Sequence, residues 1–262
     1  MESICKATLA SGADLGVIFD TDVDRAGCVG RDGKEINRNR LVALAAAIAL
    51  EDCPGGTIVT DSITSSGLKT FLEQNLGGVH YRYRRGYRNV INKAMELEGQ
   101  GISAPLAIET SGHAALKENY FLDDGAYLIT KIIIKMANLR AEGKELEDLI
   151  GALPEPVEAA EARLAIKEAD FAAYGSRVIA ALEEFAAGVD GWEIADDNRE
   201  GIRVAVDGGK GWFLLRLSVH DPIMPMNLES DRAGGVKDMA AALLPFFRQF
   251  DGLDIAPLEK LA

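Results

Sequence analysis

The sequence predicts an α/β fold followed by a smaller α+β domain. Short apolar runs alternate with helical patterns as far as about residue 150, and the short connections between them favour a parallel sheet. The Pro-Glu-Pro segment at residues 154–156 interrupts this alternation and predicts a linker. Beyond it lie two apolar runs joined by a glycine-rich turn, which is a strong β-hairpin signal.

The expected elements of the first domain follow one another at short spacing. The apolar run from Leu15 to Phe19 is expected to form a strand. The last helix of the domain is expected to place Leu128, Ile132 and Met136 along one face. After the first strand, the expected elements are, in order, strand 57–60, helix 67–75, strand 79–84, helix 89–98, strand 105–108 and this last helix at 125–141.

The second domain is expected to contain an antiparallel sheet. The runs at residues 202–206 and 212–218 are separated by Asp-Gly-Gly-Lys-Gly, which predicts a hairpin. A further short strand is expected at residues 192–194, and two helices are expected to flank the sheet in sequence, at residues 171–187 and 236–250. Antiparallel strands with neighbouring helices define a small α+β domain.

Composition excludes several classes of protein. The 262-residue chain carries a formal net charge of −13, which argues against nucleic acid or an anionic membrane as the main partner. Its apolar stretches are too short to span a bilayer. The three cysteines, Cys5, Cys28 and Cys53, show no paired metal spacing and are typical of reduced thiols in a cytoplasmic protein. Because the chain as a whole is acidic, any phosphate ligand must be held by local basic residues.

Three carboxylates follow the first expected strand at alternate positions. Asp20, Asp22 and Asp24 offer only oxygen ligands, a set that favours Mg²⁺, Ca²⁺ or Mn²⁺ over zinc. An EF-hand is excluded because its sixth and twelfth positions, which require Gly and Glu, are Arg25 and Arg31. Arg25 beside the acids suggests phosphate chemistry instead. An acidic surface turn without a metal is the alternative interpretation of this motif alone.

Two further polar segments follow expected strands. Residues 109–113, Glu-Thr-Ser-Gly-His, combine a carboxylate, hydroxyls and an imidazole and suit the recognition of sugar hydroxyls. Asp20 and Glu109 both follow strands, and ligands of parallel sheets collect at the carboxyl ends of the strands. Residues 216–222 place Arg216, Ser218 and His220 at alternate positions, a plausible phosphate cradle. The alternative interpretation of residues 109–113 is a loop that caps the next helix. The alternative for residues 216–222 is an exposed strand edge.

The order of these three segments resembles the α-D-phosphohexomutase family, the phosphoglucomutases and phosphomannomutases. Its members carry the motifs DGDxDR, GExSGH and RxSxTEP in that order, where this chain has DTDVDR, IETSGH and RLSVHDP. Thr21 and Ile108 replace glycines of the family pattern, and His220-Asp221 replaces Thr-Glu. By the same resemblance, Gly-Tyr-Arg at residues 86–88 corresponds to a loop that usually presents a Lys, so Arg88 would hold charge rather than act as a base.

The resemblance implies a fold and a set of domains. The expected fold is a three-layer α/β/α domain with a mixed sheet, followed by the small α+β domain. Residues 1–31 would be a remnant of the family's second domain with the metal loop, residues 32–155 the sugar-binding domain, and residues 156–262 the phosphate-binding domain. The family's phosphoserine loop is not found in the sequence, so we expect the chain to be a C-terminal piece whose partner is the N-terminal phosphoserine domain. Alone, it should lack turnover.

The resemblance also implies a reaction and the residues for it. Hexose 1-phosphate and 6-phosphate would interconvert through a hexose 1,6-bisphosphate, with Mg²⁺ held by Asp20, Asp22 and Asp24 and phosphoryl oxygens positioned by Arg25. The sugar hydroxyls would be bound by Glu109, Ser111, Gly112 and His113, of which His113 would also move a proton. The non-reacting phosphate would be bound by Arg216, Ser218 and His220.

Two other functions remain open from the sequence. The segment from Phe19 to Val23 also resembles the first motif of haloacid-dehalogenase-type phosphatases, with Asp20 as nucleophile and Asp22 as acid/base. Asp123 and Asp124 would then be its later acidic pair. The second alternative is a sugar-phosphate-binding module without chemistry of its own.

Overall fold

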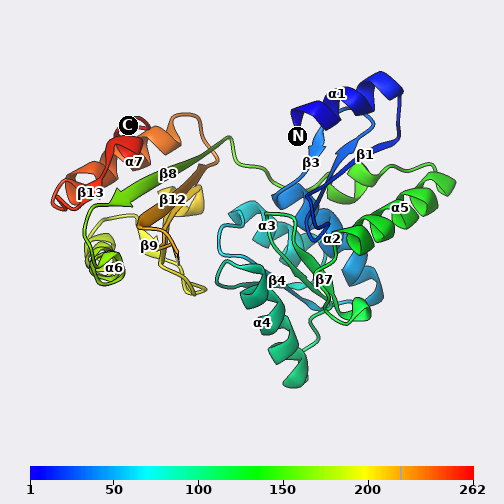
Figure 1. The fold of residues 1–262 in the computed structure, drawn as a ribbon, viewed down its shortest axis with the longest axis horizontal. Coiled ribbons are helices and arrows are strands. Elements are labelled where there is room, and N and C mark those ends of the chain that lie inside the picture. Colours follow the sequence, from blue (N-terminus) through cyan, green and yellow to red (C-terminus); the bar gives the residue numbers. More distant parts are fainter. Residues whose placement is uncertain (219) are drawn as a thin grey trace. The chain divides into compact units, whose positions relative to one another are not determined.

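The computed structural model describes residues 1–218 and 220–262, which divide into two compact units, Met1–Pro154 and Glu155–Ala262 (Figure 1). The linker expected at residues 154–156 lies at this division. The first unit contains two sheets, and the second contains one. Each unit has hydrophobic cores of its own, so each is described by itself.

A four-stranded mixed sheet forms the centre of the first unit, with the strand order β5-β4-β6-β7. β4 (Thr57–Thr60) runs parallel to β5 (Val79–Arg82) and to β6 (Leu106–Ile108). β7 (Ala114–Leu116), which the sequence did not predict, pairs antiparallel with β6. The carboxyl ends of β4, β5 and β6 therefore meet at one edge of the sheet.

Helices cover both faces of this sheet, so the side chains that point to either face of β4 and β6 are buried. Ile58 and Leu106 face a core that they share with α2 (Asn39–Asp52). Val59 faces a second core with α4 (Tyr87–Gly99). On the side of α2 lie three further elements, α3 (Ser66–Thr70), its π-helical continuation Phe71–Asn75, and α5 (Gly125–Ala141). The three-layer α/β/α prediction is confirmed.

The first 36 residues form a separate antiparallel sheet rather than part of the parallel one. Its strands are β1 (Leu15–Phe19), β2 (Ala26–Gly30) and β3 (Glu35–Ile36), with α1 (Glu2–Ser11) preceding them. The strand expected before Asp20 is thus present. The expectation that Asp20 and Glu109 follow strands of one parallel sheet is wrong, because β1 and β6 belong to different sheets.

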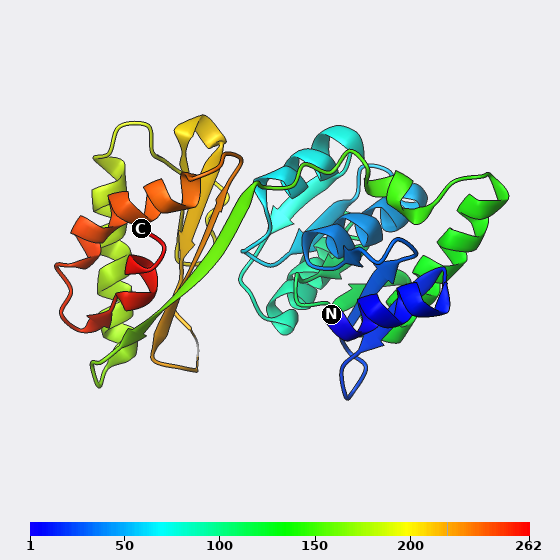
Figure 2. The same cartoon turned by 90° about the horizontal axis from the view of Figure 1, so that it is seen from above.

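The second unit is a six-stranded antiparallel sheet with the order β13-β8-β12-β11-β10-β9. In β8, Ala162, Leu164 and Ile166 are buried while alternate residues are more exposed, so one face of the sheet is covered. The covering helices lie together on that face (Figure 2). The strands are β8 (Glu158–Ile166), β9 (Glu193–Ile194), β10 (Ile202–Val206), β11 (Gly211–Leu215), β12 (Ile223–Ser230) and β13 (Leu253–Asp254), and the helices are α6 (Phe171–Ala187), α7 (Gly235–Phe247) and α8 (Ala256–Glu259).

This architecture confirms the small α+β domain. The predicted hairpin is β10 and β11, with Ile202 opposite Leu215. The largest differences from the predicted boundaries are at two ends: the second hairpin strand ends at Leu215 instead of residue 218, and the closing helix ends at Phe247 instead of residue 250. Among the described residues, no helix combines the length and apolarity that crossing a membrane requires.

All three cysteines are free, as the sequence predicted, but their environments differ. Cys28 lies fully buried in β2, where its thiol contacts the carbonyl oxygen of Ile36 at 3.6 Å. Burial and, to a smaller extent, the charge of Glu147 raise the pKa of Cys28 to about 12. Cys5 and Cys53 are half-buried.

We therefore expect the native protein to show two reactive thiols, Cys5 and Cys53, when it is titrated with a thiol reagent at about pH 8. Cys28 should react only after unfolding in urea, because its thiolate form is not populated in the core. A Cys28→Ala variant should lose one reactive group after unfolding and none before it. Loss of a reactive group in the native state would contradict the buried position.

Candidate active site

The metal loop, residues 20–25, is a tight turn between β1 and β2. Asp20, Asp22 and Asp24 each offer a carboxylate oxygen, and these oxygens all lie within 4.8 Å of one another. Val23 adopts a positive φ of 66°, which is unusual for a β-branched residue and helps to close the turn. The carboxylates thus converge around a turn rather than along a strand.

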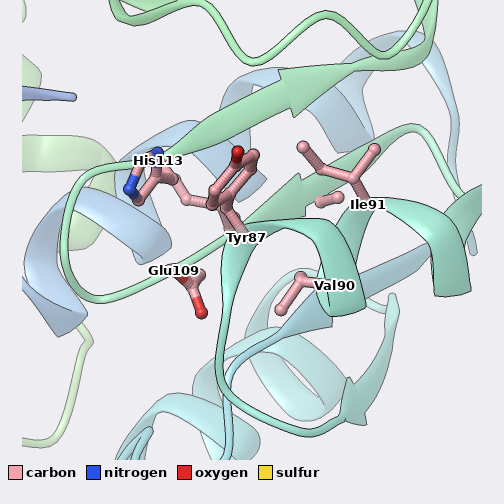
Figure 3. A pocket seen from close by; sticks show the side chains of 7 residues that line it. Tyr87, Val90, Ile91, Glu109 and His113 are labelled. Atoms are coloured by element: carbon pink, nitrogen blue, oxygen red, sulfur yellow. The ribbon is translucent and has the colours of Figure 1, made fainter. Parts of the chain in front are cut away.

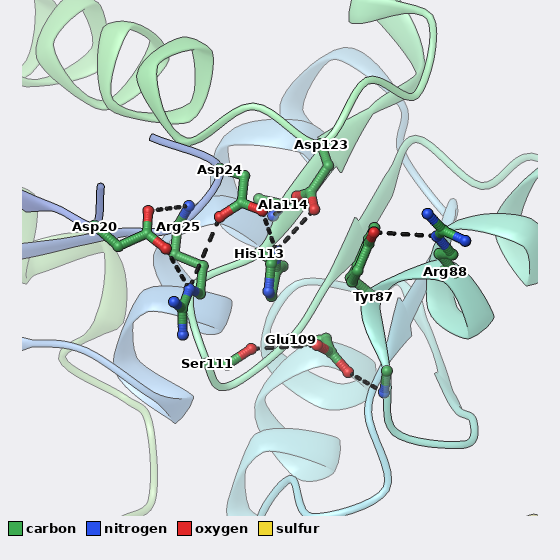
Figure 4. A network of polar contacts seen from close by, with 11 residues as sticks. Asp20, Asp24, Arg25, Tyr87, Arg88, Glu109, Ser111, His113, Ala114 and Asp123 are labelled. Atoms are coloured by element: carbon green, nitrogen blue, oxygen red, sulfur yellow. Dashed lines mark hydrogen bonds and ion pairs between the residues drawn. The ribbon is translucent and has the colours of Figure 1, made fainter. Parts of the chain in front are cut away.

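Arg25 holds one end of this loop (Figure 4). Its backbone N–H donates to Oδ1 of Asp20 at 3.2 Å, and its Nε donates to Oδ2 at 2.6 Å. The same Nε lies 3.8 Å from Oδ1 of Asp24. Burial opposes ionisation of Asp20, but the hydrogen bonds and charge of Arg25 outweigh it, so the pKa of Asp20 is lowered. Asp20 is therefore an anion at neutral pH.

Asp24 is in a less favourable position for a negative charge. Burial raises the pKa of Asp24, and the nearby charges of Asp22, Asp20 and Asp123 raise it further, while His113 opposes them. Its Oδ1 is buried and makes no hydrogen bond. A carboxylate oxygen in this state is poorly compensated, and a cation bound in the loop would relieve it.

His113 lies beside Asp24 and is fixed by two neighbours. Its Nδ1 is 2.7 Å from Oδ2 of Asp123 and 3.7 Å from Oδ2 of Asp24. The ring of Tyr87 stacks on the imidazole with 4.9 Å between centroids. Burial lowers the pKa of His113, but the hydrogen bond from its ring to Asp123 and the charges of Asp123 and Asp24 raise it, and the net direction is upward. Figure 4 shows the second ring nitrogen directed away from Asp123.

The sugar loop, residues 109–113, joins β6 to β7. It is a compact turn, since Glu109 and His113 pair through their backbones at 2.9 Å and the N–H of Gly112 donates to the carbonyl of Glu109 at 3.0 Å. The buried Glu109 carboxylate accepts the backbone N–H of Gly86 at 2.6 Å and the hydroxyl of Ser111 at 3.2 Å. Glu109 therefore connects the sugar loop to the loop that precedes α4.

The metal loop and the sugar loop are joined by backbone pairing. Arg25 and His113 form an antiparallel bridge, and the N–H of Ala26 donates to the carbonyl of Gly112 at 3.2 Å. Gly112 has a φ of +102°, and a Cβ there would lie 2.5 Å from the carbonyl oxygen of Ala26. Only glycine allows this approach, so the two motifs meet because residue 112 has no side chain.

Helix α5 begins at the metal loop. The N–H of Gly125 donates to the carbonyl of Val23 at 3.1 Å, and a Cβ on Gly125 would lie 2.9 Å from that oxygen. Asp124 caps the helix by accepting the N–H of Tyr127 at 2.9 Å. The amino-terminal end of a helix carries a partial positive charge, which favours the carboxylates gathered there.

Arg88 lies on the far side of Tyr87 from His113 (Figure 4). Its Nε donates to the hydroxyl oxygen of Tyr87 at 3.0 Å, and its side chain is exposed at the start of α4. Tyr87, rather than Arg88, contacts the imidazole. Tyr87 also forms one wall of a small, mainly apolar pocket that ends at Glu109 and His113 (Figure 3).

The expected phosphate residues lie in the second unit, after β11. The backbone N–H groups of Arg216 and Ser218 donate to carbonyls of β12 at 3.1 and 3.0 Å, which extends the pairing beyond the strand. Ser218 accepts the N–H of Asp221 at 3.3 Å, and His220 is exposed. Val219 of this motif lies outside the described residues. The roles of Arg216, Ser218 and His220 stay predictions.

Sequence reasoning did not assign Tyr87 to the site, and it considered Asp123 only for the phosphatase alternative. Both are prominent in the structure, since each contacts His113. Asp123 also accepts the N–H of Ala114 at 3.2 Å, so it holds the imidazole and the start of β7 together. An Asp-Asp pair before a helix and a single Tyr after a Gly carry no local pattern that predicts contacts with His113.

The contact between Gly112 and Ala26 predicts a specific loss of stability. Gly112→Ala should destabilise the first unit by about 1–3 kcal/mol more than Gly101→Ala, because only residue 112 is overpacked against backbone. Gly101 is the matched control, since its φ is +79° and a Cβ there meets nothing within 4 Å. Urea unfolding followed by circular dichroism measures the difference.

Tryptophan fluorescence supplies the internal control for that experiment. Trp192 and Trp212 both belong to the second unit, so their unfolding transition should not move in either variant. Equal destabilisation by Gly112→Ala and Gly101→Ala would show that the two loops do not meet as described.

Comparison with known proteins identifies relatives of this chain. Residues 37–157 match the phosphoglucomutase/phosphomannomutase α/β/α domain III. The chain is 33% identical over 222 residues to a phosphomannomutase/phosphoglucomutase of Pseudomonas syringae, a match that covers 84% of this chain and 44% of the relative. It is 30% identical over 233 residues to a phosphomannomutase/phosphoglucomutase of Pseudomonas putida, a match that covers 88% of this chain and 46% of the relative. The chain thus spans less than half the length of these curated relatives.

Solved structures show the same relationship. A phosphoglucomutase/phosphomannomutase family protein of Burkholderia thailandensis superposes with a TM-score of 0.77 at 25% identity, over 95% of this chain and 49% of that one. An N-acetylphosphoglucosamine mutase of Aspergillus fumigatus, solved with GlcNAc-6P and magnesium, shares the fold with a TM-score of 0.58 at 12% identity, over 89% and 48%. With its three ordered motifs and this fold, the chain belongs to the α-D-phosphohexomutase family.

Proposed function

We propose that the chain is the C-terminal half of a Mg²⁺-dependent phosphohexomutase that interconverts hexose 1-phosphate and 6-phosphate through a hexose 1,6-bisphosphate. The observation that carries the proposal is the backbone pairing of Ala26 with Gly112, which brings a cluster of carboxylates beside a loop of sugar-binding chemistry. The curated relatives are phosphomannomutases and phosphoglucomutases, which supports hexose phosphates as substrates. The proposed location is the cytoplasm.

The metal loop fits Mg²⁺ by its chemistry. Its three candidate ligands, Asp20, Asp22 and Asp24, supply only carboxylate oxygens, and one buried oxygen of Asp24 makes no hydrogen bond. Mg²⁺ bound there would neutralise charge on the transferring phosphoryl group. The A. fumigatus enzyme that shares this fold was solved with magnesium and a sugar phosphate, which supports the same cofactor here.

The chain's own residues would position the substrate around that group. Arg25 would hold phosphoryl oxygens with its guanidinium, which the hydrogen bond to Asp20 orients. Ser111 would bind a sugar hydroxyl, and the buried Glu109 would orient Ser111. His113, fixed through Nδ1 by Asp123, would use its other nitrogen to exchange a proton with a sugar oxygen. Gly112 supplies the turn that places these groups.

The second unit and the rest of the parent protein complete the proposal. Arg216, Ser218 and His220 would bind the phosphate that is not reacting, which allows a bisphosphate to be held in either direction. Arg88 would hold charge rather than act as a base, and its hydrogen bond to the Tyr87 hydroxyl would connect it to the site. The N-terminal phosphoserine domain would donate and recover the phosphoryl group. Residues 1–31 would be a remnant of the family's second domain that carries the metal loop, residues 32–155 would bind the sugar and residues 156–262 the phosphate.

Two contacts argue against the phosphatase alternative. Both oxygens of Asp20, the candidate nucleophile, accept hydrogen bonds from Arg25. Asp124, one of the expected later acids, is engaged as the cap of α5. Asp20 is therefore not arranged for nucleophilic attack on a phosphate, and Asp124 is already engaged by the helix. A sugar-phosphate-binding module remains the proposal for this chain when it is separated from its parent.

Magnesium binding tests the metal loop directly. Calorimetric titration of Mg²⁺ should show one site in the chain, and Asp22→Asn should weaken it by about tenfold or more, since Asn removes one of the charged ligands that set affinity. Asp32→Asn is the matched control, because Asp32 is an exposed carboxylate in the β2–β3 turn of the same sheet. Equal Mg²⁺ affinity in Asp22→Asn and Asp32→Asn would place the cation elsewhere.

Turnover tests the reaction. A fusion of the amino-terminal half of the P. syringae relative to this chain should convert glucose 1-phosphate or mannose 1-phosphate to the 6-phosphate, whereas the chain alone should not. The positive control is the same fusion made from the relative's own two halves. A folded chimera that binds Mg²⁺ and hexose phosphate but stays inactive, beside an active control fusion, would favour the binding module.

A further inference from the structure

Asp61 is a buried carboxylate that the proposed reaction does not use. It follows β4 at the carboxyl edge of the parallel strands and is fully buried. Its Oδ1 accepts the backbone N–H of Thr110 at 3.1 Å, and its Oδ2 accepts the hydroxyl of Thr110 at 2.8 Å. Both oxygens therefore hold one residue, the second of the sugar loop.

The contact joins the ends of three neighbouring strands. Asp61 follows β4, Thr110 follows β6, and Arg85, from the segment after β5, places its Nε 3.8 Å from Oδ2 of Asp61. The side chain of Arg85 is 31% exposed, whereas that of Asp61 is 0% exposed. The negative charge of Asp61 is thus fully inside the protein, whereas its cationic partner is partly exposed to solvent.

Holding this charge is unfavourable for the folded state. Burial raises the pKa of Asp61 to about 6, helped by the charge of Glu109 and opposed by Arg85 and by both hydrogen bonds from Thr110. The folded protein therefore binds a proton at the Asp61 carboxylate more tightly than the unfolded chain does. Asp61 therefore lowers stability as the pH rises from about 4 to about 6, and the loss is complete above that range. Global stability does not explain this carboxylate.

The consequence of the contact lies in the neighbouring residues. Thr110 is buried and turned toward Asp61, while the next residue, Ser111, is exposed. The residue before it, Glu109, binds the hydroxyl of Ser111 and the N–H of Gly86. Fixing Thr110 therefore sets which way the functional side chains on either side of it face.

We propose that Asp61 is a positioning residue that fixes the sugar loop through Thr110, so that Ser111 and Glu109 are presented to the hydroxyls of a hexose phosphate. The inference rests on the proposed function and deepens it, because it separates recognition of the sugar from recognition of the phosphate. The sugar part of the ligand depends on Asp61, and the phosphate part does not.

Ligand titration of the full 262-residue chain tests this separation. Glucose 6-phosphate and inorganic phosphate are the two probes. Asp61→Ala and Thr110→Val should each weaken glucose 6-phosphate binding by about fivefold to tenfold, through loss of hydrogen bonds that hold the loop. Both variants should bind inorganic phosphate within about twofold of the wild-type affinity, a ratio that corresponds to less than about 0.5 kcal/mol.

Conservative variants and a matched control complete the series. Thr110→Ser keeps the hydroxyl and should bind glucose 6-phosphate like the wild type. Asp61→Asn keeps an oxygen for the Thr110 N–H while it removes the buried charge, so it should retain most of the affinity and melt no lower than the wild type at about pH 7.5. Thr57→Val, a buried threonine at the opposite end of β4, should leave binding unchanged.

Hydrogen exchange keeps this test independent of the proposed function. The amides of Ser111 and Gly112 should exchange faster in Asp61→Ala than in the wild type and in Thr57→Val. If the wild type binds neither ligand, the proposed function fails, and the exchange rates still decide whether Asp61 fixes the loop. Unchanged exchange rates, unchanged glucose 6-phosphate affinity in Asp61→Ala, or an equal loss of inorganic phosphate affinity would each overturn the inference.

Discussion

The close approach of two backbone segments determines the site in the first unit. The metal loop belongs to a small antiparallel sheet and the sugar loop to a mixed sheet, so no common sheet aligns them. They are joined where Ala26 pairs with Gly112 and Arg25 with His113. Backbone pairing of this kind tolerates no side chain at residue 112, and the geometry of both motifs depends on that glycine.

Once the loops are joined, electrostatics shapes the site. Asp24 belongs to two groups of potential ligands, one with Asp20 and Asp22 and one with His113 and Asp123. Arg25 compensates part of this negative charge, and the amino-terminal end of α5 favours it as well. The remaining charge is what a divalent cation would neutralise, and a change at the metal loop would reach His113 through Asp24.

The sequence predicted those features that leave a local pattern. The strand at residues 57–60 and the helices at residues 125–141 and 171–187 were found with the predicted bounds, because they combine apolar periodicity with clear ends. Helix α2 was missed because every residue from Leu41 to Leu50 is buried, which leaves no polar face to reveal a helical period. β7 was missed because its sequence, Ala-Ala-Leu, contains no β-branched or aromatic residue that would favour a strand.

The same distinction applies to the residues of the candidate site: those in a sequence motif were predicted, and those outside one were not. The ordered motifs predicted the family, which the comparisons confirm, and they named Asp20, Asp24 and His113, which the structure brings together. Asp61 and Asp123 belong to none of the three ordered motifs, so only the fold reveals their contacts with Thr110 and His113. Their importance comes from the edge of the sheet, where separate strands end side by side.

The central claim is that a cation held by the metal loop lies next to the sugar loop. Amide resonances of the isotope-labelled chain, recorded while Mn²⁺ is added as a paramagnetic substitute for Mg²⁺, test it most directly. The account predicts broadening at residues 20–25 and, at the same Mn²⁺ concentration, at residues 111–113 and 123, with recovery when Mg²⁺ competes. Broadening that spares residues 111–113, or that is centred on other acidic surfaces, would contradict it.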